Sequence, residues 1–209
     1  MSHPFSILGR GKAGRALAAA WGGRVELLPH EARPGGFVLL AVPDRAVAAL
    51  AEAFPGRCAH LSGSLHLPGI PGLHPLTSFN GTAEPWEGTP LALDGDPPIW
   101  LTAAFAELGF LPFALDPQLK ALYHACAVLT SGHAATLWLG AQALMAARGV
   151  TLPGRGFLPL AEATLRNVAA QGEAGRTGPF VRGDQPTIAA DAEALPAEWR
   201  EIFLKLGAL

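Results

Sequence analysis

The sequence predicts a doubly wound α/β domain with a parallel sheet, followed by an all-helical domain. Short apolar runs alternate with helical patterns in the first half of the chain, and a glycine-rich turn joins the first run to the first helix. Beyond Asp116-Pro117 the strand-like runs end and only helical patterns follow. Alternating strands and helices are typical of a parallel sheet that is covered on both faces. We therefore expect an α/β domain over 1–116 and a helical domain over 117–209.

The individual elements follow from hydrophobic periodicity and from the Gly, Pro and polar residues that bound each run. Predicted strands span 5–8, 25–28, 37–42, 58–61, 90–93 and 111–115. Predicted helices span 12–21, 44–54, 99–108, 118–148, 156–171 and 189–206. The segment 68–88 is rich in Pro and Gly and is expected to form loops.

The connection between the second and third predicted strands is unusually short. It comprises residues 29–36, whereas a parallel crossover normally takes a dozen or more residues and contains a helix. Fully extended, such a segment reaches about 28 Å, which barely suffices to return along one strand and pass over a neighbour. We therefore predict that the usual helix is missing, which would leave a thin outer wall on the adenosine side of a nucleotide pocket.

Composition excludes several classes of function. Fifteen basic and seventeen acidic residues give a formal charge of −2, and no stretch concentrates Lys or Arg as a nucleic-acid surface would require. Cys58 and Cys126 form no Cys-x-x-Cys motif and follow no secretory signal, which favours the cytoplasm. The apolar segment 121–147 contains polar side chains and glycines, so we expect a buried helix and no membrane span. The dispersed histidines lack the spacing of zinc sites, and no metal is expected.

The turn Gly9-Arg10-Gly11-Lys12-Ala13-Gly14 matches the dinucleotide-binding motif between a strand and a helix. Gly9 would permit the tight turn, Gly11 would let backbone N–H groups approach a pyrophosphate, and Gly14 would let the helix pack close to the strand. The N-terminus of the helix attracts phosphate charge. The alternative is a glycine-rich turn without a ligand. We expect all six residues to border a cofactor.

The residues that follow the second strand would decide the choice of cofactor. Glu31 would hold a ribose hydroxyl and favour NAD, whereas Arg33 would bind a 2′-phosphate and favour NADP. This stretch leaves the choice between the two cofactors open, with a slight preference for NADP.

The ends of the third and fourth strands also border the expected site, because ligands of parallel sheets lie beyond the carboxyl ends of the strands. Val42 and Pro43 would border the nicotinamide ribose, and Asp44 is expected to cap the following helix. Ser62, Gly63 and Ser64 end the fourth strand. The two serines could bind the carboxamide of the nicotinamide or a substrate carboxylate, with capping of a helix as the alternative.

At this point the chain resembles a family of Rossmann-like NAD(P)-binding oxidoreductases with a C-terminal helical domain of unknown function. That family is related to 6-phosphogluconate dehydrogenase, pyrroline-carboxylate reductase and ketopantoate reductase. The residues that carry the likeness are 8–14, 40–44, 60–64, 73–79, 93–96, 123–127, Asn167 and 177–184. The resemblance implies a helical domain that builds a homodimer and an active site in the cleft between the domains. Two departures are the missing Ser-Arg pair after the second strand and Gly132, where relatives tend to have Asn.

Candidate catalytic residues follow from the same resemblance. Lys120 and His124 lie four residues apart on a predicted helix and share a face. In the related hydroxyacid dehydrogenases a Lys at this position is the acid or base, so Lys120 or His124 would transfer the proton. The alternatives are a solvated lysine and a hydrogen-bonded core histidine. His74-Pro75 is similar to a His-Pro of prephenate dehydrogenases near the substrate, and Arg182 could pair with a carboxylate or phosphate.

Together these features predict an NAD(P)-dependent oxidoreductase that acts on a small keto, hydroxy or imino acid-like substrate between the two domains. The alternative is a non-catalytic nucleotide-sensing or scaffold protein that dimerises through its helical domain. The short segment 29–36 favours the sensor, whereas the His and Ser residues at the expected cleft favour the enzyme.

Overall fold

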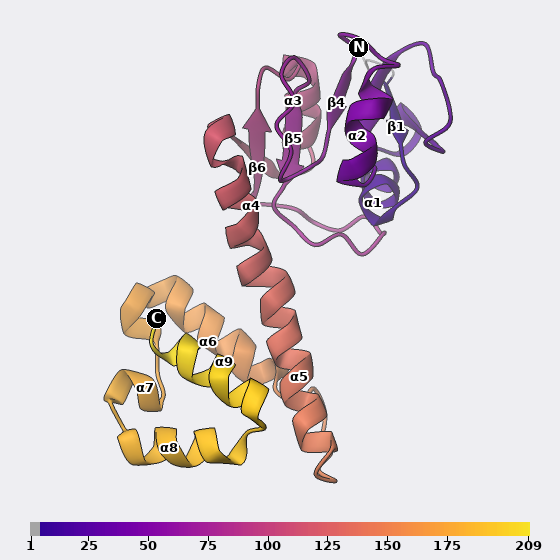
Figure 1. Ribbon diagram of the computed structural model, residues 1–209. Coiled ribbons are helices and arrows are strands. Elements are labelled where there is room, and N and C mark those ends of the chain that lie inside the picture. The colour runs from indigo at the N-terminus through magenta and orange to yellow at the C-terminus, as the bar shows by residue number, and fades with distance from the viewer. Residues whose placement is uncertain (1–4) are drawn as a thin grey trace. The chain divides into compact units, whose positions relative to one another are not determined.

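The computed structural model describes residues 5–209, which divide into two compact units (Figure 1). The first unit ends at Ala134, and the second extends from Ala135 to Leu209. Within the described residues the whole β-sheet lies in the first unit, and the second consists of helices and their connections. This organisation confirms the predicted fold class. The predicted domain boundary at residue 116 stays a prediction, and the helix α4 (Lys120–Val128) lies in the first unit.

The first unit is built on a single sheet whose strand order is β2-β1-β3-β4-β5-β6-β7. Its strands are β1 (Phe5–Leu8), β2 (Val25–Leu28), β3 (Phe37–Leu40), β4 (Cys58–His60), β5 (Gly72–Pro75), β6 (Thr89–Asp94) and β7 (Phe110–Ala114). Strands β1 to β5 are parallel, whereas β6 runs antiparallel to β5 and β7 parallel to β6. The carboxyl ends of β1, β3, β4 and β5 therefore point to the same edge of the sheet.

Helices cover both faces of this sheet, as a mostly parallel sheet requires. α1 (Lys12–Trp21) and α3 (Ile99–Ala106) contribute Leu17, Trp21, Leu101 and Phe105 to one core. α2 (Asp44–Ala51) packs on the opposite face, in a second core around Val47 and Phe54. Successive residues of each central strand alternate between the two cores, because neighbouring side chains of a strand point to opposite faces.

The connection 29–36 contains no helix, as predicted from its length. It leaves the end of β2 and passes over β1 to reach β3, which pairs with the other side of β1. The Arg57 guanidinium holds the end of this segment, donating hydrogen bonds to the carbonyls of Pro34 and Gly36 at 3.0 and 2.7 Å. The same guanidinium lies over the Phe54 ring at 4.9 Å.

One loop predicted in the first unit was wrong. The segment 68–88 was expected to form loops, yet it contains β5. This strand pairs with β4 through the single pair His60↔Gly72, so most of its hydrogen bonding is with β6. The pairing partner follows β5 by more than a dozen residues, which is why local composition gave no signal for it.

The remaining helices follow β7 and are numbered in chain order. After a 3-10 turn (Pro117–Leu119) they are α4, a π-helical turn (Leu129–His133), α5 (Ala134–Ala146), α6 (Leu158–Gln171), α7 (Pro179–Arg182), α8 (Gln185–Ala194) and α9 (Ala197–Gly207). Among residues 5–209, no helix combines the length and apolar composition that crossing a membrane requires.

The helix predicted over 189–206 was wrong, because the structure has two helices there. Leu195 adopts an extended conformation with ψ 144°, and Pro196 occupies the N-cap of α9. The proline ring disfavours a helical conformation of the preceding residue, which explains the break.

Candidate functional site

The glycine turn between β1 and α1 packs closely against the backbone around it. Gly9 has a φ of +116°, and a Cβ there would lie 2.2 Å from the Ala41 carbonyl oxygen. A Cβ at Gly14 would lie 2.0 Å from the Gly9 carbonyl oxygen, so α1 packs against the turn as closely as backbone allows. At Gly11, in contrast, a Cβ would meet nothing within 4 Å. Two of the three glycines are thus required by packing, and the third leaves open space.

This turn lies at the point where the strand order reverses. Strands β2 and β3 flank β1 on its two sides, and the Gly9 N–H donates to the Leu28 carbonyl at 3.0 Å. Open parallel sheets bind ligands at such a switch point, beyond the carboxyl ends of the strands. Gly11 caps α1 without a side-chain hydrogen bond, and the first turn of α1 has no acidic residue. Val42 and Pro43 follow β3 at this same edge. The predicted cofactor residues around the turn are therefore brought together.

The side chains of the turn are basic and solvent-exposed. Arg10 and Lys12 are exposed, and neither forms an ion pair with a carboxylate within the described residues. The Arg15 guanidinium donates to the Arg10 carbonyl at 2.8 Å. Ala13 is partly buried in the first turn of α1. The turn therefore presents positive charge and open backbone at the place where a pyrophosphate would lie.

The two residues expected to choose the cofactor lie in the loop after β2. The Glu31 carboxylate pairs with the His30 ring at 3.2 Å, and both side chains are largely exposed. The Arg33 guanidinium donates to the carbonyls of His30 and Ala32 and lies 5.9 Å from the centre of the Phe54 ring. Arg33 is thus occupied by contacts within its own loop and with the core residue Phe54.

The end of β4 forms a hydrogen-bonded turn. The Ser62 Oγ accepts from the backbone N–H groups of Ser64 and Leu65 at 3.2 and 3.0 Å. The Ser64 hydroxyl donates to the Asp44 carboxylate at 2.6 Å. Asp44 was expected to cap α2, but it is the first residue of that helix and makes no capping hydrogen bond, so that expectation was wrong. It links the loops after β3 and β4 instead.

Two imidazole rings lie against Gly63. A Cβ at Gly63 would lie 2.7 Å from His74 Nε2 and 2.8 Å from His124 Cδ2, so a larger residue there would have to displace the two imidazoles. His74 lies on β5, whereas His124 and Tyr123 lie on α4. The His74 Nδ1 and the Tyr123 hydroxyl are 2.9 Å apart. The structure therefore brings together the predicted residues Gly63, His74 and His124.

These histidines line a pocket of about 380 Å³ within the first unit. Its walls come from the loop after β5, from α4 and from the π-helical turn, and its lining residues are His74, Leu76, Thr77, Ser78, His124, Ala127, Val128, Thr130 and Ser131. Burial, reinforced by the His124 and Lys120 side chains, lowers the pKa of His74 to about 4. His74 is therefore a neutral imidazole at neutral pH.

Lys120 has a buried partner that the sequence did not reveal. Its Nζ lies 2.7 Å from Asp94 Oδ2, and both side chains are 2% exposed. The other carboxylate oxygen of Asp94 lies 2.8 Å from His66 Nδ1. Burial alone would raise the pKa of Asp94, but the hydrogen bonds from Lys120 and His66 hold it below 3.8. Lys120 is therefore not the solvated lysine that the sequence offered as the alternative to a catalytic residue.

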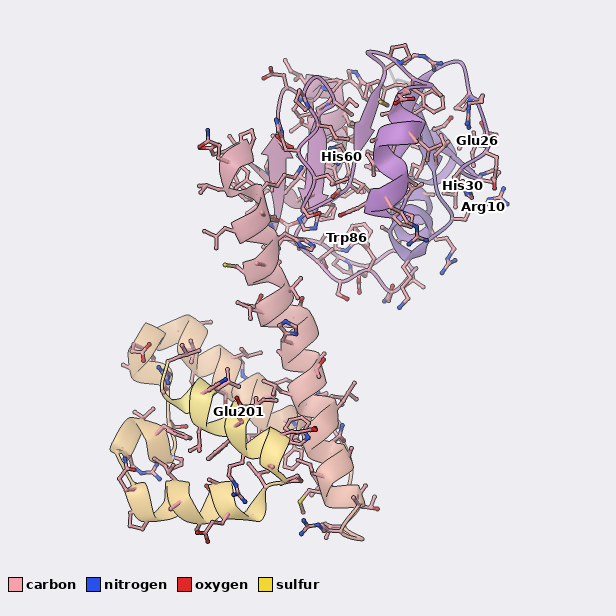
Figure 2. The ribbon with its side chains drawn as sticks, viewed as in Figure 1. Arg10, Glu26, His30, His60, Trp86 and Glu201 are labelled. Carbon is pink, nitrogen blue, oxygen red and sulfur yellow. The ribbon has the colours of Figure 1, made fainter. Side chains whose placement is uncertain are left out.

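His60 is a second residue that sequence reasoning missed. Its side chain lies inside the first unit and is fully buried (Figure 2). Its Nδ1 accepts from the Ser62 N–H at 3.2 Å, and its Nε2 has no hydrogen-bond partner within the described residues. A Cβ at Gly72 would lie 2.7 Å from Lys120 Nζ and 3.3 Å from His60 Nε2, which places these two groups close together. Burial, followed by the Lys120 charge, lowers the pKa of His60 to about 4.

Arg182 ends α7 in the second unit and is exposed. Its charge contributes to lowering the pKa of Asp184, although the hydrogen bonds from Thr187 are the larger cause. Its predicted contact with substrate stays a prediction.

The fold and the site define a Rossmann-type α/β protein with a helical C-terminal unit. A family model described as "Domain of unknown function (DUF2520)" matches residues 89–209, which is more than half of the chain. The chain therefore belongs to this family. No curated protein matches the chain.

Solved structures share the fold at low sequence identity. BF3122 from Bacteroides fragilis, provisionally named an NADP oxidoreductase, is 18% identical with a TM-score of 0.79, over 99% of this chain and 97% of that one. TM1727 from Thermotoga maritima is 18% identical with a TM-score of 0.74, and the match covers 98% of this chain and 95% of that one. A reductive aminase from Aspergillus terreus, in complex with NADPH and ethyl levulinate, is 16% identical with a TM-score of 0.60. The match covers 100% of this chain and 92% of that one.

Proposed function

We propose that this protein is an NAD(P)-dependent oxidoreductase that transfers a hydride between a nicotinamide dinucleotide and a small polar substrate. The observation that carries the proposal is the glycine turn at the strand switch point, in which Gly9 and Gly14 are fixed by backbone packing and Gly11 is open. A turn that needed only to be tight would not require open space at its middle glycine. The likeness to the NADPH-bound Aspergillus terreus reductive aminase supports the same function.

The residues present fit a dinucleotide. The backbone N–H groups that begin α1 are free of side-chain caps, and the adjoining Arg10 and Lys12 supply positive charge for a pyrophosphate. Val42 and Pro43 would border the ribose next to the nicotinamide, and the turn Ser62–Gly63 would border the carboxamide. The bound cofactor would supply the hydride, so few protein groups are needed for the chemistry.

The substrate would occupy the pocket beside His74 and His124. Of the two proton donors suggested by the sequence, the proposal favours His124, because Lys120 is buried and holds Asp94. His124 would give a proton to the substrate heteroatom during reduction and take it back in the reverse reaction. Thr77 and Ser78 add hydroxyl groups, while Leu76 and Val128 limit the size of the substrate. A keto, hydroxy or imino acid-like molecule fits this mixture.

We also propose that NADPH is preferred over NADH. Arg10, Lys12 and Arg15 place three basic side chains at the turn, and Glu31, the residue expected to select NAD, is paired with His30. Arg10 is the candidate for the 2′-phosphate, because Arg33 is held within its loop.

A homodimer is part of the proposal. Within residues 135–209 only Gly175, Ile188 and Ala192 are buried, and α5 has no buried residue although it is almost entirely apolar. A unit of this size with so few buried side chains gains little stability alone, so a second copy would cover its apolar surface. Sedimentation equilibrium of the full chain tests this: a concentration-independent monomer would refute it.

The experiment that tests the function is a titration of nucleotide-free protein with NADPH and NADH, followed by energy transfer from tryptophan to the reduced nicotinamide. We expect saturation by NADPH at micromolar concentration. Gly11→Val should abolish it without unfolding, because nothing lies within 4 Å of the added side chain. Gly23→Val is the matched control, since Gly23 also lies in open space but outside the turn. Unchanged binding by Gly11→Val would refute the site.

The structure also favours a second candidate, a nucleotide sensor without turnover. The helix missing from 29–36 removes the outer wall of the adenosine pocket, which fits weak and regulatory binding. NADPH oxidation with a panel of small keto and imino acids separates the two, because a sensor would bind NADPH and oxidise none of them.

A further inference from the structure

Tyr123 contacts His74 through its hydroxyl group and through its ring. Its hydroxyl is 2.9 Å from His74 Nδ1, and the two rings meet edge to face, with centres 5.5 Å apart. The two residues come from different elements, α4 and β5, so the contact is a tertiary one. Burial raises the pKa of Tyr123 to about 12, so the phenol keeps its proton at neutral pH.

The direction of this hydrogen bond depends on the tautomer of His74. A neutral imidazole carries one proton, on Nδ1 or on Nε2. If Nδ1 carried it, the Tyr123 oxygen would accept, and the half-buried phenol would donate its own proton to solvent. If the phenol donates to Nδ1, the O–H is satisfied and the imidazole proton lies on Nε2.

We infer that Tyr123 is a positioning residue that fixes His74 as an Nε2–H donor, aimed at an oxygen acceptor of the ligand in the pocket. Nε2 lies on the far side of the ring from Tyr123, beside Gly63, whose missing side chain leaves room for it. A carbonyl or carboxylate oxygen can accept this hydrogen bond, whereas an ammonium or iminium N–H cannot. His74 therefore orients the substrate, and the proton comes from His124.

The inference rests on the proposed function only for its ligand, since the tautomer of His74 is a property of the protein alone. The titratable and charged groups that act on His74 are His124 and Tyr123 from α4, Lys120 at the start of that helix and Asp44 from α2. His124 and Lys120 disfavour a proton on His74, and Asp44 favours it.

Long-range proton–nitrogen NMR correlation on the full chain, labelled with nitrogen-15 histidine and free of nucleotide, tests the inference. We expect a single neutral pattern with the proton on Nε2 between about pH 6 and 8. His74→Gln assigns the signals and keeps an N–H group at the position of Nε2. Tyr123→Phe removes only the hydroxyl and should replace the single pattern by a mixture of both tautomers.

His60 is an internal control in the same spectra. Its Nδ1 accepts from the Ser62 backbone, so it should show the Nε2–H pattern in the wild-type protein and in Tyr123→Phe alike. An Nδ1–H pattern for His74, or an unchanged pattern in Tyr123→Phe, would overturn the inference. Neither result depends on NADPH, so a failed cofactor titration is a separate outcome that leaves the tautomer assignment standing.

Discussion

Replacing Lys120 by Met tests the buried ion pair that the structure reveals. The Lys120 ammonium and the Asp94 carboxylate are 2.7 Å apart and 2% exposed. Removing one partner of a buried pair leaves the other charge without compensation, which costs about 3–5 kcal/mol in comparable cases. His66 still donates to Asp94 after the change, so we place the expected loss at the lower end, about 3 kcal/mol.

The assay is urea unfolding at pH 7.5, followed by circular dichroism and tryptophan fluorescence. The double variant Lys120→Met with Asp94→Asn should regain most of the loss, because an amide oxygen still accepts from His66 and no buried charge remains. The matched control is Lys205→Met, which breaks an equally short pair with Glu201 whose side chains are 75% and 67% exposed. That control should leave the free energy of unfolding almost unchanged.

A loss in Lys120→Met as small as that in the control would refute this reasoning. The ammonium would then be free of Asp94 in solution, and the acid–base role suggested by the sequence would regain support. If the loss is large and the double variant recovers it, Lys120 is a structural cation. Turnover in the folded double variant would then assign the proton transfer to another group, with His124 as the candidate.

Three further predictions follow from the site. Gly9→Ala should lower the free energy of unfolding by at least about 2 kcal/mol, because φ is +116° and the Cβ would lie 2.2 Å from a carbonyl oxygen. Gly23→Ala, in open space, should be tolerated, and urea unfolding measures both variants. The folded-state pKa of His60 and of His74 is about 4 against 6.5 for an unperturbed histidine, so unfolding takes up protons as the pH falls below 6.5. The free energy of unfolding should therefore be highest above pH 6.5 and decrease towards pH 4, and it should decrease less in His74→Gln. A free energy of unfolding that does not change with pH would show that both rings are solvated. Arg10→Ala should weaken NADPH binding about tenfold, the value of one charge-assisted hydrogen bond, and leave NADH binding unchanged. An equal loss of affinity for both cofactors would show that Arg10 does not bind the 2′-phosphate.

Local sequence predicted the parts of the fold that local forces determine. The glycine turn was predictable because three spaced glycines between a strand and a helix have few other uses. The missing crossover helix was predictable from chain length alone, since 29–36 is too short to contain it. The strand β5 was not predictable in this way, because its pairing partner lies in β6 and its own residues include two of the turn-forming types.

In the candidate site, too, contacts between distant parts of the chain could not be predicted from local sequence. The sequence placed Lys120 and His124 on one helix face, yet the partner that determines the role of Lys120 is Asp94, 26 residues earlier. Asp94 stands in Leu93-Asp94-Gly95-Asp96, which carries part of the family likeness but gives no indication that Asp94 meets Lys120. Only the register of β5 against β6, which sets Gly72 opposite Asp94, brings the carboxylate to the place where Lys120 can reach it. No spacing rule within one element contains that information.

The short crossover changes which contacts must bind a cofactor. In a complete crossover, the helix and its preceding loop supply a wall for the adenine, but 29–36 is a loop held down by Arg57. Binding free energy that the adenine wall would provide must then come from the phosphates, which here meet an open glycine, an uncapped helix N-terminus and exposed basic side chains. Attraction between exposed charges is screened by salt. NADPH affinity should therefore fall steeply with ionic strength, and an affinity that is insensitive to salt would show that the adenine pocket supplies the binding after all.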